Sequence, residues 1–296
     1  HELQIIANAS GNFENEFIRN YNEIRPAYTI NEWFDTSKTT ENYETFQIDY
    51  SKPFGLFKLE TGFKSRIRSI DFFYRNSNNP YQPQQYGDNN FLYDDGIHAL
   101  YLMGSSKLEK WEFQLGLRTE YYVLNTYQKA NGTKNNKEDV NFFPTLHISN
   151  TFGDNKFMAG YSRRVNRPHI HFLNPYEEYE DPYNVDKGNP DLDPEFSHSL
   201  EFNYLRYFGQ SSASATVFYR QTDNAISRVR RLYDPNSTNG LMLNTFENLN
   251  KQSSLGIEVS IRQSLVKWLQ VDGNYSFFKY NIEGKTDGET VDAQSI

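Results

Sequence analysis

The chain has 296 residues, no cysteine and a formal net charge of -8. Absence of cysteine excludes disulfides, zinc–thiolate sites and thiol catalysis, and the acidic balance argues against a nucleic-acid partner, which needs a basic surface. Mean hydropathy is -0.80 and no run of about 18 apolar residues is present, so no transmembrane helix is expected. A transmembrane β-barrel remains compatible, because each strand turns one face to lipid and one to a wet interior.

Alternation of apolar and polar residues with a period of two recurs along the chain and predicts β-strands. In the segment 111–123, Trp111, Leu115 and Val123 share one face, whereas Glu112 and Arg118 share the other. The same alternation occurs in segments 57–68, 212–220, 255–262 and 269–277.

The predicted connections alternate between short and long. Short turns rich in Gly, Pro, Asn or Ser are predicted at 52–55, 105–107, 152–155, 208–210 and 264–267. Long polar loops are predicted at 21–42, 76–90, 129–139, 167–195, 231–240 and from about 281 onward. Short turns at the periplasmic end and long loops at the extracellular end are typical of outer-membrane barrels.

These patterns predict an all-β fold, an antiparallel up-and-down transmembrane β-barrel with about eleven strands in this chain. Single-chain bacterial barrels close with an even number of strands, and an unpaired strand edge in lipid is unfavourable. We therefore expect residues 1–296 to be part of one outer-membrane β-barrel domain, truncated at both ends, with no second domain. A soluble β-sandwich is the alternative, but the long strands with charged and amide residues on their second face favour the barrel.

One segment is more specific than the alternation. It runs through Gly160-Tyr161-Ser162-Arg163-Arg164-Val165-Asn166-Arg167-Pro168 and Leu173-Asn174-Pro175 to Gly188-Asn189-Pro190-Asp191-Leu192-Asp193-Pro194-Glu195. This segment resembles the barrel region of TonB-dependent receptors, most closely the outer-membrane β-barrel family of Bacteroidota. In that family a Ser-Arg-Arg-x-Asn-Arg-Pro strand end precedes a Gly-Asn-Pro-x-Leu-x-Pro-Glu loop. The resemblance extends over nearly the whole chain.

The resemblance implies a barrel of about 22 strands, plugged by an N-terminal globular domain and energised through the periplasmic partner TonB. Contact with TonB is expected only through N-terminal segments that this sequence lacks. The implied location is the bacterial outer membrane, with its lipid as a partner, and the implied function is a receptor or transporter barrel that binds or admits a substrate. Two alternatives stay open. One is a barrel scaffold or accessory subunit that holds a surface lipoprotein or other subunits of a complex; the other is a plug-free diffusion porin.

The prolines and amides of the motif suggest a structural role. Proline removes a backbone donor and fixes φ, so Pro168 and Pro175 are expected to end the ladder where the strand leaves the membrane. Gly188 is expected to adopt a conformation closed to other residues. We interpret the set as a rigid corner of one extracellular loop, with direct ligand contact as the alternative: Pro168, Asn174, Pro175, Gly188, Asn189, Pro190, Pro194 and Glu195.

The candidate ligand-binding residues are arginines near two strand ends, namely Arg163, Arg164 and Arg167 at one and Arg228 and Arg230 at the other. Inside a barrel, such side chains bind anionic ligands through bidentate contacts. Pairing with carboxylates of the barrel interior is the commoner arrangement and stays open as the alternative.

Eight carboxylates between residues 177 and 195 form an acidic loop. Calcium prefers such oxygen ligands, but the Asp-x-Asn-x-Asp-Gly spacing is missing, so a solvated loop is favoured. His169 and His171 lack a fixed acidic partner, and we expect neither a metal site nor a cofactor. We do not expect an enzyme, because no catalytic motif is present and nothing in the sequence ties His98 or His147 to nearby serines as a triad.

Overall fold

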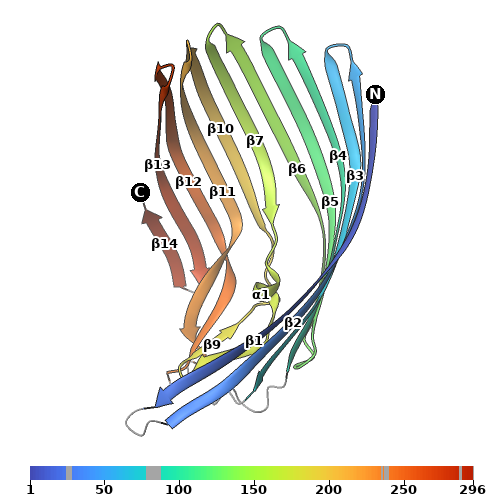
Figure 1. Cartoon of the computed structure of the whole chain (residues 1–296), viewed down its shortest axis with the longest axis vertical. Helices are drawn as coiled ribbons and strands as arrows, with labels where there is room; N and C mark the ends of the chain where they lie inside the picture. Colours follow the sequence, from blue (N-terminus) through green and yellow to red (C-terminus); the bar gives the residue numbers. More distant parts are fainter. Residues whose placement is uncertain (25–28, 78–87, 235, 237–239, 287–288, 296) are drawn as a thin grey trace.

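The chain forms one open, curved sheet in the computed structural model, which describes residues 1–24, 29–77, 88–234, 236, 240–286 and 289–295 (Figure 1). Each strand of the main path pairs antiparallel with the next one along the chain. The path contains β1 (Glu2–Ile24), β2 (Thr29–Phe54), β3 (Phe57–Ser77), β4 (Asn89–Leu108), β5 (Trp111–Gln128), β6 (Lys134–Phe152), β7 (Asn155–Asn166), β10 (Glu195–Phe208), β11 (Ser211–Leu232), β12 (Met242–Val266), β13 (Leu269–Thr286) and β14 (Glu289–Ser295).

The segment between β7 and β10 contains three short elements, α1 (Ile170–Leu173), β8 (Glu177–Asp181) and β9 (Asn184–Lys187). β8 pairs antiparallel with β9, which in turn pairs parallel with the start of β12. The predicted all-β, antiparallel, up-and-down architecture is confirmed, with twelve strands on the main path of the described residues where about eleven were expected. The open sheet is consistent with part of a larger barrel. No helix of the described residues is long and apolar enough to cross a membrane.

Tight turns join the strands at one end of the sheet, which is the upper end in Figure 1. Gly55, Gly153 and Gly209 occupy three of these turns with φ of 62°, 57° and 63°, in the left-handed region that glycine tolerates best. These three turns lie where the sequence predicts them. The turn predicted at 105–107 is wrong, because β4 continues to Leu108 and the chain turns just before β5 begins at Trp111. In this turn the non-glycine residue Glu109 adopts a φ of 53°.

The longer connections lie at the opposite end, but three segments predicted as loops are largely strand. One of them is the segment from 281 onward, where β13 continues to Thr286 and β14 follows. β1 continues to Ile24 and β2 begins at Thr29, so most of the predicted loop 21–42 belongs to a hairpin. The predicted loop 129–139 is short, because β6 begins at Lys134. Neighbouring strands hydrogen-bond each other's backbone groups also where the sequence is polar. A run of polar side chains therefore does not by itself end a strand. The predicted loop 76–90 falls mostly outside the described residues.

The two faces of the sheet differ in chemistry, as the alternation predicts. On β5, Leu115 and Leu117 are 64% and 47% exposed on the outer face, whereas Glu120 and Tyr122 are 6% and 3% exposed on the inner face. Large apolar side chains likewise stay exposed on the outer face of other strands, among them Leu100, Phe142, Leu200, Val217, Ile257 and Tyr275. Part of the inner face is therefore covered by other residues of the chain and not by solvent.

Candidate functional site

The residues that cover the inner face belong to the connection between β7 and β10, residues 167–195, here called the inward loop. This loop turns back into the curve of the sheet, where α1 lies in Figure 1. Its Leu173 and Leu192 are each 1% exposed. They pack in one hydrophobic cluster with Ile70, Phe91, Tyr93, Ile97, Tyr122 and Leu124 of β3–β5, bordered by Ile226 of β11 and Phe246 of β12. Burial of these side chains holds the loop against both sides of the sheet.

Gly188 closes the inward loop on itself. Its backbone amide donates a 2.9 Å hydrogen bond to the carbonyl of Asn174, and the amide of Asn189 donates a 2.6 Å bond to that of Phe172. A Cβ at position 188 would lie 2.5 Å from the Asn174 carbonyl oxygen. The expectation that Gly188 needs an unusual φ is wrong, since it is not among the residues with positive φ. Glycine is required there by close approach of two backbone segments.

Three amide side chains anchor the loop to the wall. Gln128 Nε2 donates to Asn89 Oδ1 at 2.6 Å and to Asn174 Oδ1 at 2.9 Å, while Asn174 Nδ2 donates to Asn89 Oδ1 at 3.3 Å. Gln128 is fully buried and Asn89 is 4% exposed. Pro168 and Pro175, which flank α1, are also buried. Since buried polar groups are costly without partners, this amide cluster fixes the position of the loop.

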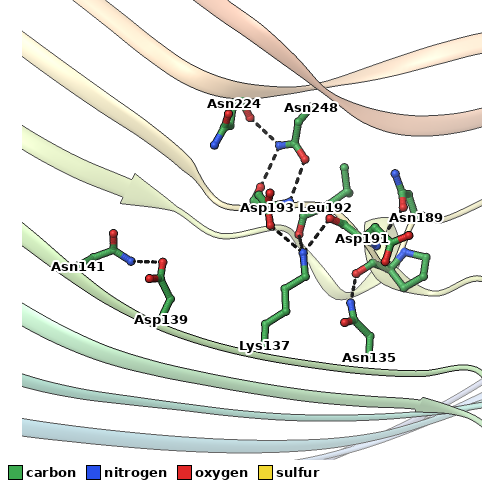
Figure 2. A network of polar contacts seen from close by, with 11 residues as sticks. Asn135, Lys137, Asp139, Asn141, Asn189, Asp191, Leu192, Asp193, Asn224 and Asn248 are labelled. Carbon is green, nitrogen blue, oxygen red and sulfur yellow. Dashed lines mark hydrogen bonds and ion pairs between the residues drawn. The ribbon is translucent and has the colours of Figure 1, made fainter. Parts of the chain in front are cut away.

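The Gly-Asn-Pro part of the loop is held by Lys137 of β6 (Figure 2). The Lys137 ammonium group donates to the carbonyls of Asp191 and Leu192 and to the Asp193 carboxylate, each at 2.8 Å. Beside it, Asn135 donates to the Pro190 carbonyl. One cation therefore binds two backbone carbonyls and one carboxylate of the loop.

Asn248 of β12 holds the same segment from the other side (Figure 2). Its side chain accepts a bond from the Asp193 amide and donates one to the Asp193 carbonyl, each at 2.9 Å. Glu195 then receives a 2.6 Å bond from the backbone amide of Ile226 on β11. The loop thus bridges β6 to β11 and β12.

An ion pair holds the first residue of the inward loop against the wall. Arg167 lies 2.7 Å from Glu120 of β5, which also pairs with Arg118 at 2.5 Å. The Arg167 guanidinium stacks over the ring of Tyr122, 4.4 Å from its centroid. The pair places the first residue of the loop on the inner wall.

Sequence reasoning missed a second buried charge on the same wall. Asp95 of β4 has a fully buried side chain and pairs with Arg66 and Arg68 of β3 at 2.6 Å each. Arg68 also donates to the Tyr93 hydroxyl at 2.9 Å. The alternation does put both arginines on the polar face, but the register that sets Asp95 opposite Arg68 cannot be read from a single strand.

Two of the cavities along the inner face lie at its opposite ends. The loop-end cavity, of about 520 Å³, has aromatic walls and both signs of charge, including Tyr74, Tyr176, Glu178, Asp186 and Arg228. Burial, followed by the charges of Glu178 and Asp88, raises the pKa of Tyr176 to about 12, so this phenol stays neutral. The turn-end cavity, of about 790 Å³, is lined by polar side chains that include Gln114, His147, Ser162, Arg164, Ser199 and Glu201. Both cavities suit polar ligands or a polar protein segment.

The family of the protein follows from its sequence profile. The model of the outer membrane protein beta-barrel family matches residues 1–296. The chain belongs to this family. Its outer face is therefore the lipid-facing side of a barrel in the bacterial outer membrane, and its inner face borders the lumen. No curated protein matches the sequence significantly.

Solved structures of transport proteins share the fold. The copper transporter OprC superposes with a TM-score of 0.66 at 11% identity, covering 95% of this chain and 47% of that one. The ferric citrate transporter FecA gives 0.61 at 15% identity, covering 96% and 41%. The hemophore receptor HasR of Serratia marcescens, in complex with its hemophore HasA and heme, gives 0.59 at 13%, covering 96% and 49%. The chain spans less than half the length of each of these proteins.

The three candidate arginines at the end of β7 lie in different surroundings. Arg163 packs over the ring of Phe196, 4.4 Å from its centroid, and donates to the Phe142 carbonyl at 2.7 Å. Arg164 lines the turn-end cavity of the lumen, and Arg167 is paired with Glu120. The structure therefore does not bring these three residues into one site.

Arg228 and Arg230, in contrast, lie together on β11 and contact β9 of the inward loop. Arg228 lies 3.1 Å from the Asp186 carboxylate, and Arg230 donates to Asn184 at 2.8 Å. Of the two, Arg228 lines the loop-end cavity. Both arginines thus hold the inward loop, and Arg228 also borders space that a ligand can enter.

The carboxylates of the acidic loop engage separate partners. Glu177 pairs with Lys187 at 2.9 Å, while hydrogen bonds from the Asn184 side chain and the Tyr183 amide hold the pKa of Asp181 below its usual range. His169 and His171 stack on each other with ring centroids 5.1 Å apart. Within the described residues, no group of three or more His, Asp or Glu side chains is arranged to hold a metal ion.

Proposed function

We propose that the protein forms the barrel of an outer-membrane receptor that binds a substrate at the loop end and admits it to the cell. In this proposal, uptake is driven through TonB by segments of the full-length protein outside the sequence described here. The barrel is of the type found in Bacteroidota. We propose no enzymatic role.

The observation that carries this proposal is the inward loop. A diffusion pore needs an open path through its lumen, whereas residues 167–195 fold inward from this wall and are held by buried contacts with β3–β6, β11 and β12. Cavities remain on the lumen wall at both ends of the barrel. A loop fixed inside the curve of the wall, beside a polar cavity, supports selective binding over free diffusion.

The structural relatives support the same function. Their titles describe a copper transporter, a ferric citrate transporter and a receptor bound to a hemophore. In our proposal, Arg228 and Arg230 at the loop end and Arg164 further along the lumen are the arginines of this chain that contact the substrate. Arg163 contacts neighbouring strands of the wall, and Arg167 positions the start of the inward loop.

Two measurements on the full-length protein test the proposal. A receptor is expected to show no steady conductance in planar bilayers and to bind the purified periplasmic domain of TonB. A steady, salt-dependent conductance would overturn the proposal in favour of a diffusion porin. Absence of both conductance and TonB binding would overturn it in favour of a scaffold or accessory subunit of an outer-membrane complex.

A further inference from the structure

Two cations lie on the lipid-facing surface at its tight-turn end, in the middle of the sheet and away from its edge strands. Lys110, in the turn between β4 and β5, places its ammonium group 4.8 Å from the centroid of the Phe152 ring. Phe152 is 64% exposed on the lipid-facing side of β6. Arg206 of β10 lies on the same side, since it is in phase with Phe202, which is 51% exposed there. Both cations therefore belong to the outer surface of the barrel.

These two cations differ from their neighbours in having no carboxylate partner. Within the residues that the structure describes, neither Lys110 nor Arg206 forms an ion pair. On the lumen side of the same end, Lys107 and Lys156 both pair with Glu112, at 2.8 and 3.8 Å. The cations that face the lumen are thus neutralised by the protein itself, whereas the two that face lipid keep their hydrogen-bond donors available.

The carboxylates of this end do not face lipid. On the strands, Glu60 of β3 and Glu112 of β5 fall on the lumen side of the alternation, and Glu109 and Asp154 lie in the turns. The sequence around the tight turns contains eight Lys or Arg and five Asp or Glu, counted over residues 50–61, 104–115, 148–159, 204–215 and 262–273. Since the whole chain has a net charge of -8, the tight-turn end is basic and the remainder of the chain is acidic.

Aromatic rings on the same side show the level at which the two cations lie. Trp111 and Phe113 of β5 stack with ring centroids 5.9 Å apart, and Phe157 of β7 stacks on Tyr204 of β10 at 5.0 Å. Trp111 is 48% exposed, and the apolar row begins two residues beyond Phe113 with Leu115. Girdles of aromatic residues flank the apolar band of outer-membrane barrels at the level of the head groups. The two cations therefore lie at the border between acyl chains and head groups.

We infer that this rim binds anionic phospholipids of the leaflet at the tight-turn end, with the phosphate of one lipid against Lys110 and that of another against Arg206. Phosphate oxygens accept charge-assisted hydrogen bonds from both an ammonium and a guanidinium group. Each cation near a membrane surface strengthens binding to an anionic lipid about fivefold. A zwitterionic lipid gains less, because its own ammonium group competes for the phosphate. This inference is independent of the proposed transport function.

Native mass spectrometry of the full-length protein tests the rim, with phosphatidylglycerol and phosphatidylethanolamine as competing probes in equal amounts. The wild type is expected to retain two phosphatidylglycerol molecules, each with about a fivefold preference over phosphatidylethanolamine. Lys110→Gln and Arg206→Gln are each expected to lose one of the two, and the double variant is expected to lose the preference. The matched control is Lys129→Gln, which removes an exposed cation between β5 and β6 at the loop end and is expected to behave as the wild type.

Charge-conserving variants separate the charge of the two side chains from their packing. Lys110→Arg and Arg206→Lys are expected to keep the preference for phosphatidylglycerol, because each retains a cation at the same level. Heat-modifiable migration in gels shows that each variant is folded. Equal retention of the two lipids by the wild type, or an unchanged preference in the folded double variant, would overturn the inference. An equal loss of preference in Lys129→Gln would also overturn it, because the preference would then follow the total charge of the protein and not the rim.

Discussion

The Arg167 guanidinium lies 2.7 Å from the Glu120 carboxylate, and the two side chains are only 15% and 7% exposed. One residue begins the inward loop and the other belongs to the lumen wall, so this contact couples the loop to the barrel. Without Arg167, Glu120 would keep Arg118 as a cationic partner, so the expected loss is that of one hydrogen bond to a charged group, about 1.5–3 kcal/mol.

We therefore expect Arg167→Met to loosen the inward loop by about 1.5–3 kcal/mol, measured as faster hydrogen exchange across residues 167–195. In a double-mutant cycle, Glu120→Gln should loosen the loop less in Arg167→Met than in the wild type, because the contact between the two residues is already lost there. Identical exchange in wild type and Arg167→Met would show that the hydrophobic cluster alone positions the loop.

Gly188→Ala should also disturb the inward loop, because the added Cβ would lie 2.5 Å from the Asn174 carbonyl oxygen. Overpacking of this kind costs about 1–3 kcal/mol. Limited proteolysis between α1 and β10 provides the measurement. The matched control is Gly273→Ala on β13, where no atom lies within 4 Å of the new Cβ. Equal protease resistance of the two variants would contradict the close-approach argument.

The alternation of β12 assigns Ile257 to lipid and Glu258 to the lumen. Spin labels at these positions should show oxygen-favoured accessibility at Ile257 and nickel-favoured accessibility at Glu258. Arginine at Val259, on the lipid-facing side, should destabilise the barrel by about 2–4 kcal/mol if it lies near mid-membrane. Oxygen-favoured accessibility at Glu258 would mean that the register is shifted by one residue.

The inward loop should become less stable in acid. Burial, followed by the neighbouring His169, lowers the pKa of His171 from 6.5. Since the folded state then takes up a proton less readily than the unfolded state, the contribution to stability is complete above about pH 6.5 and is lost as the pH falls toward the folded-state pKa. Hydrogen exchange of residues 170–174, corrected for intrinsic rates, should be faster at about pH 5.5 than at about pH 7.5. His171→Gln should reduce this difference, and an unchanged difference would assign it to another group.

The sidedness of the barrel is testable with epitope tags at two turns. Gly132 lies between β5 and β6 at the loop end, and Gly209 lies between β10 and β11 at the tight-turn end. We expect antibody to label intact cells tagged near Gly132 and to leave those tagged near Gly209 unlabelled until the membrane is permeabilised. The reverse labelling would invert the topology.

Much of the fold was predictable, because the alternation in segments such as 111–123 reports directly which side chains face lipid. Strand ends were less predictable. Glu109 turns the chain without a glycine, and β1 and β2 extend through polar sequence because their partner strands satisfy the backbone.

The candidate site was predictable only in part. The motif around Gly188 and Pro190 identified the inward loop, but not its direction, since Leu173 and Leu192 show their role only when packed against β3–β5. The Asp95 pairs depend on the register between β3 and β4, which no local pattern encodes. Local composition marks a loop, whereas its partners depend on strands far away in the sequence.

The double attachment of Asp193 has a mechanical consequence. Through Lys137 the residue is tied to β6, and through Asn248 it is tied to β12, across the three intervening strands β7, β10 and β11. The hydrogen bonds of Asp193 therefore form a cross-link of fixed length between β6 and β12. Any change in the circumference of the barrel at this level must stretch or break the contacts of Asp193 with Lys137 and Asn248. The shape of the rim and the position of the loop therefore change together.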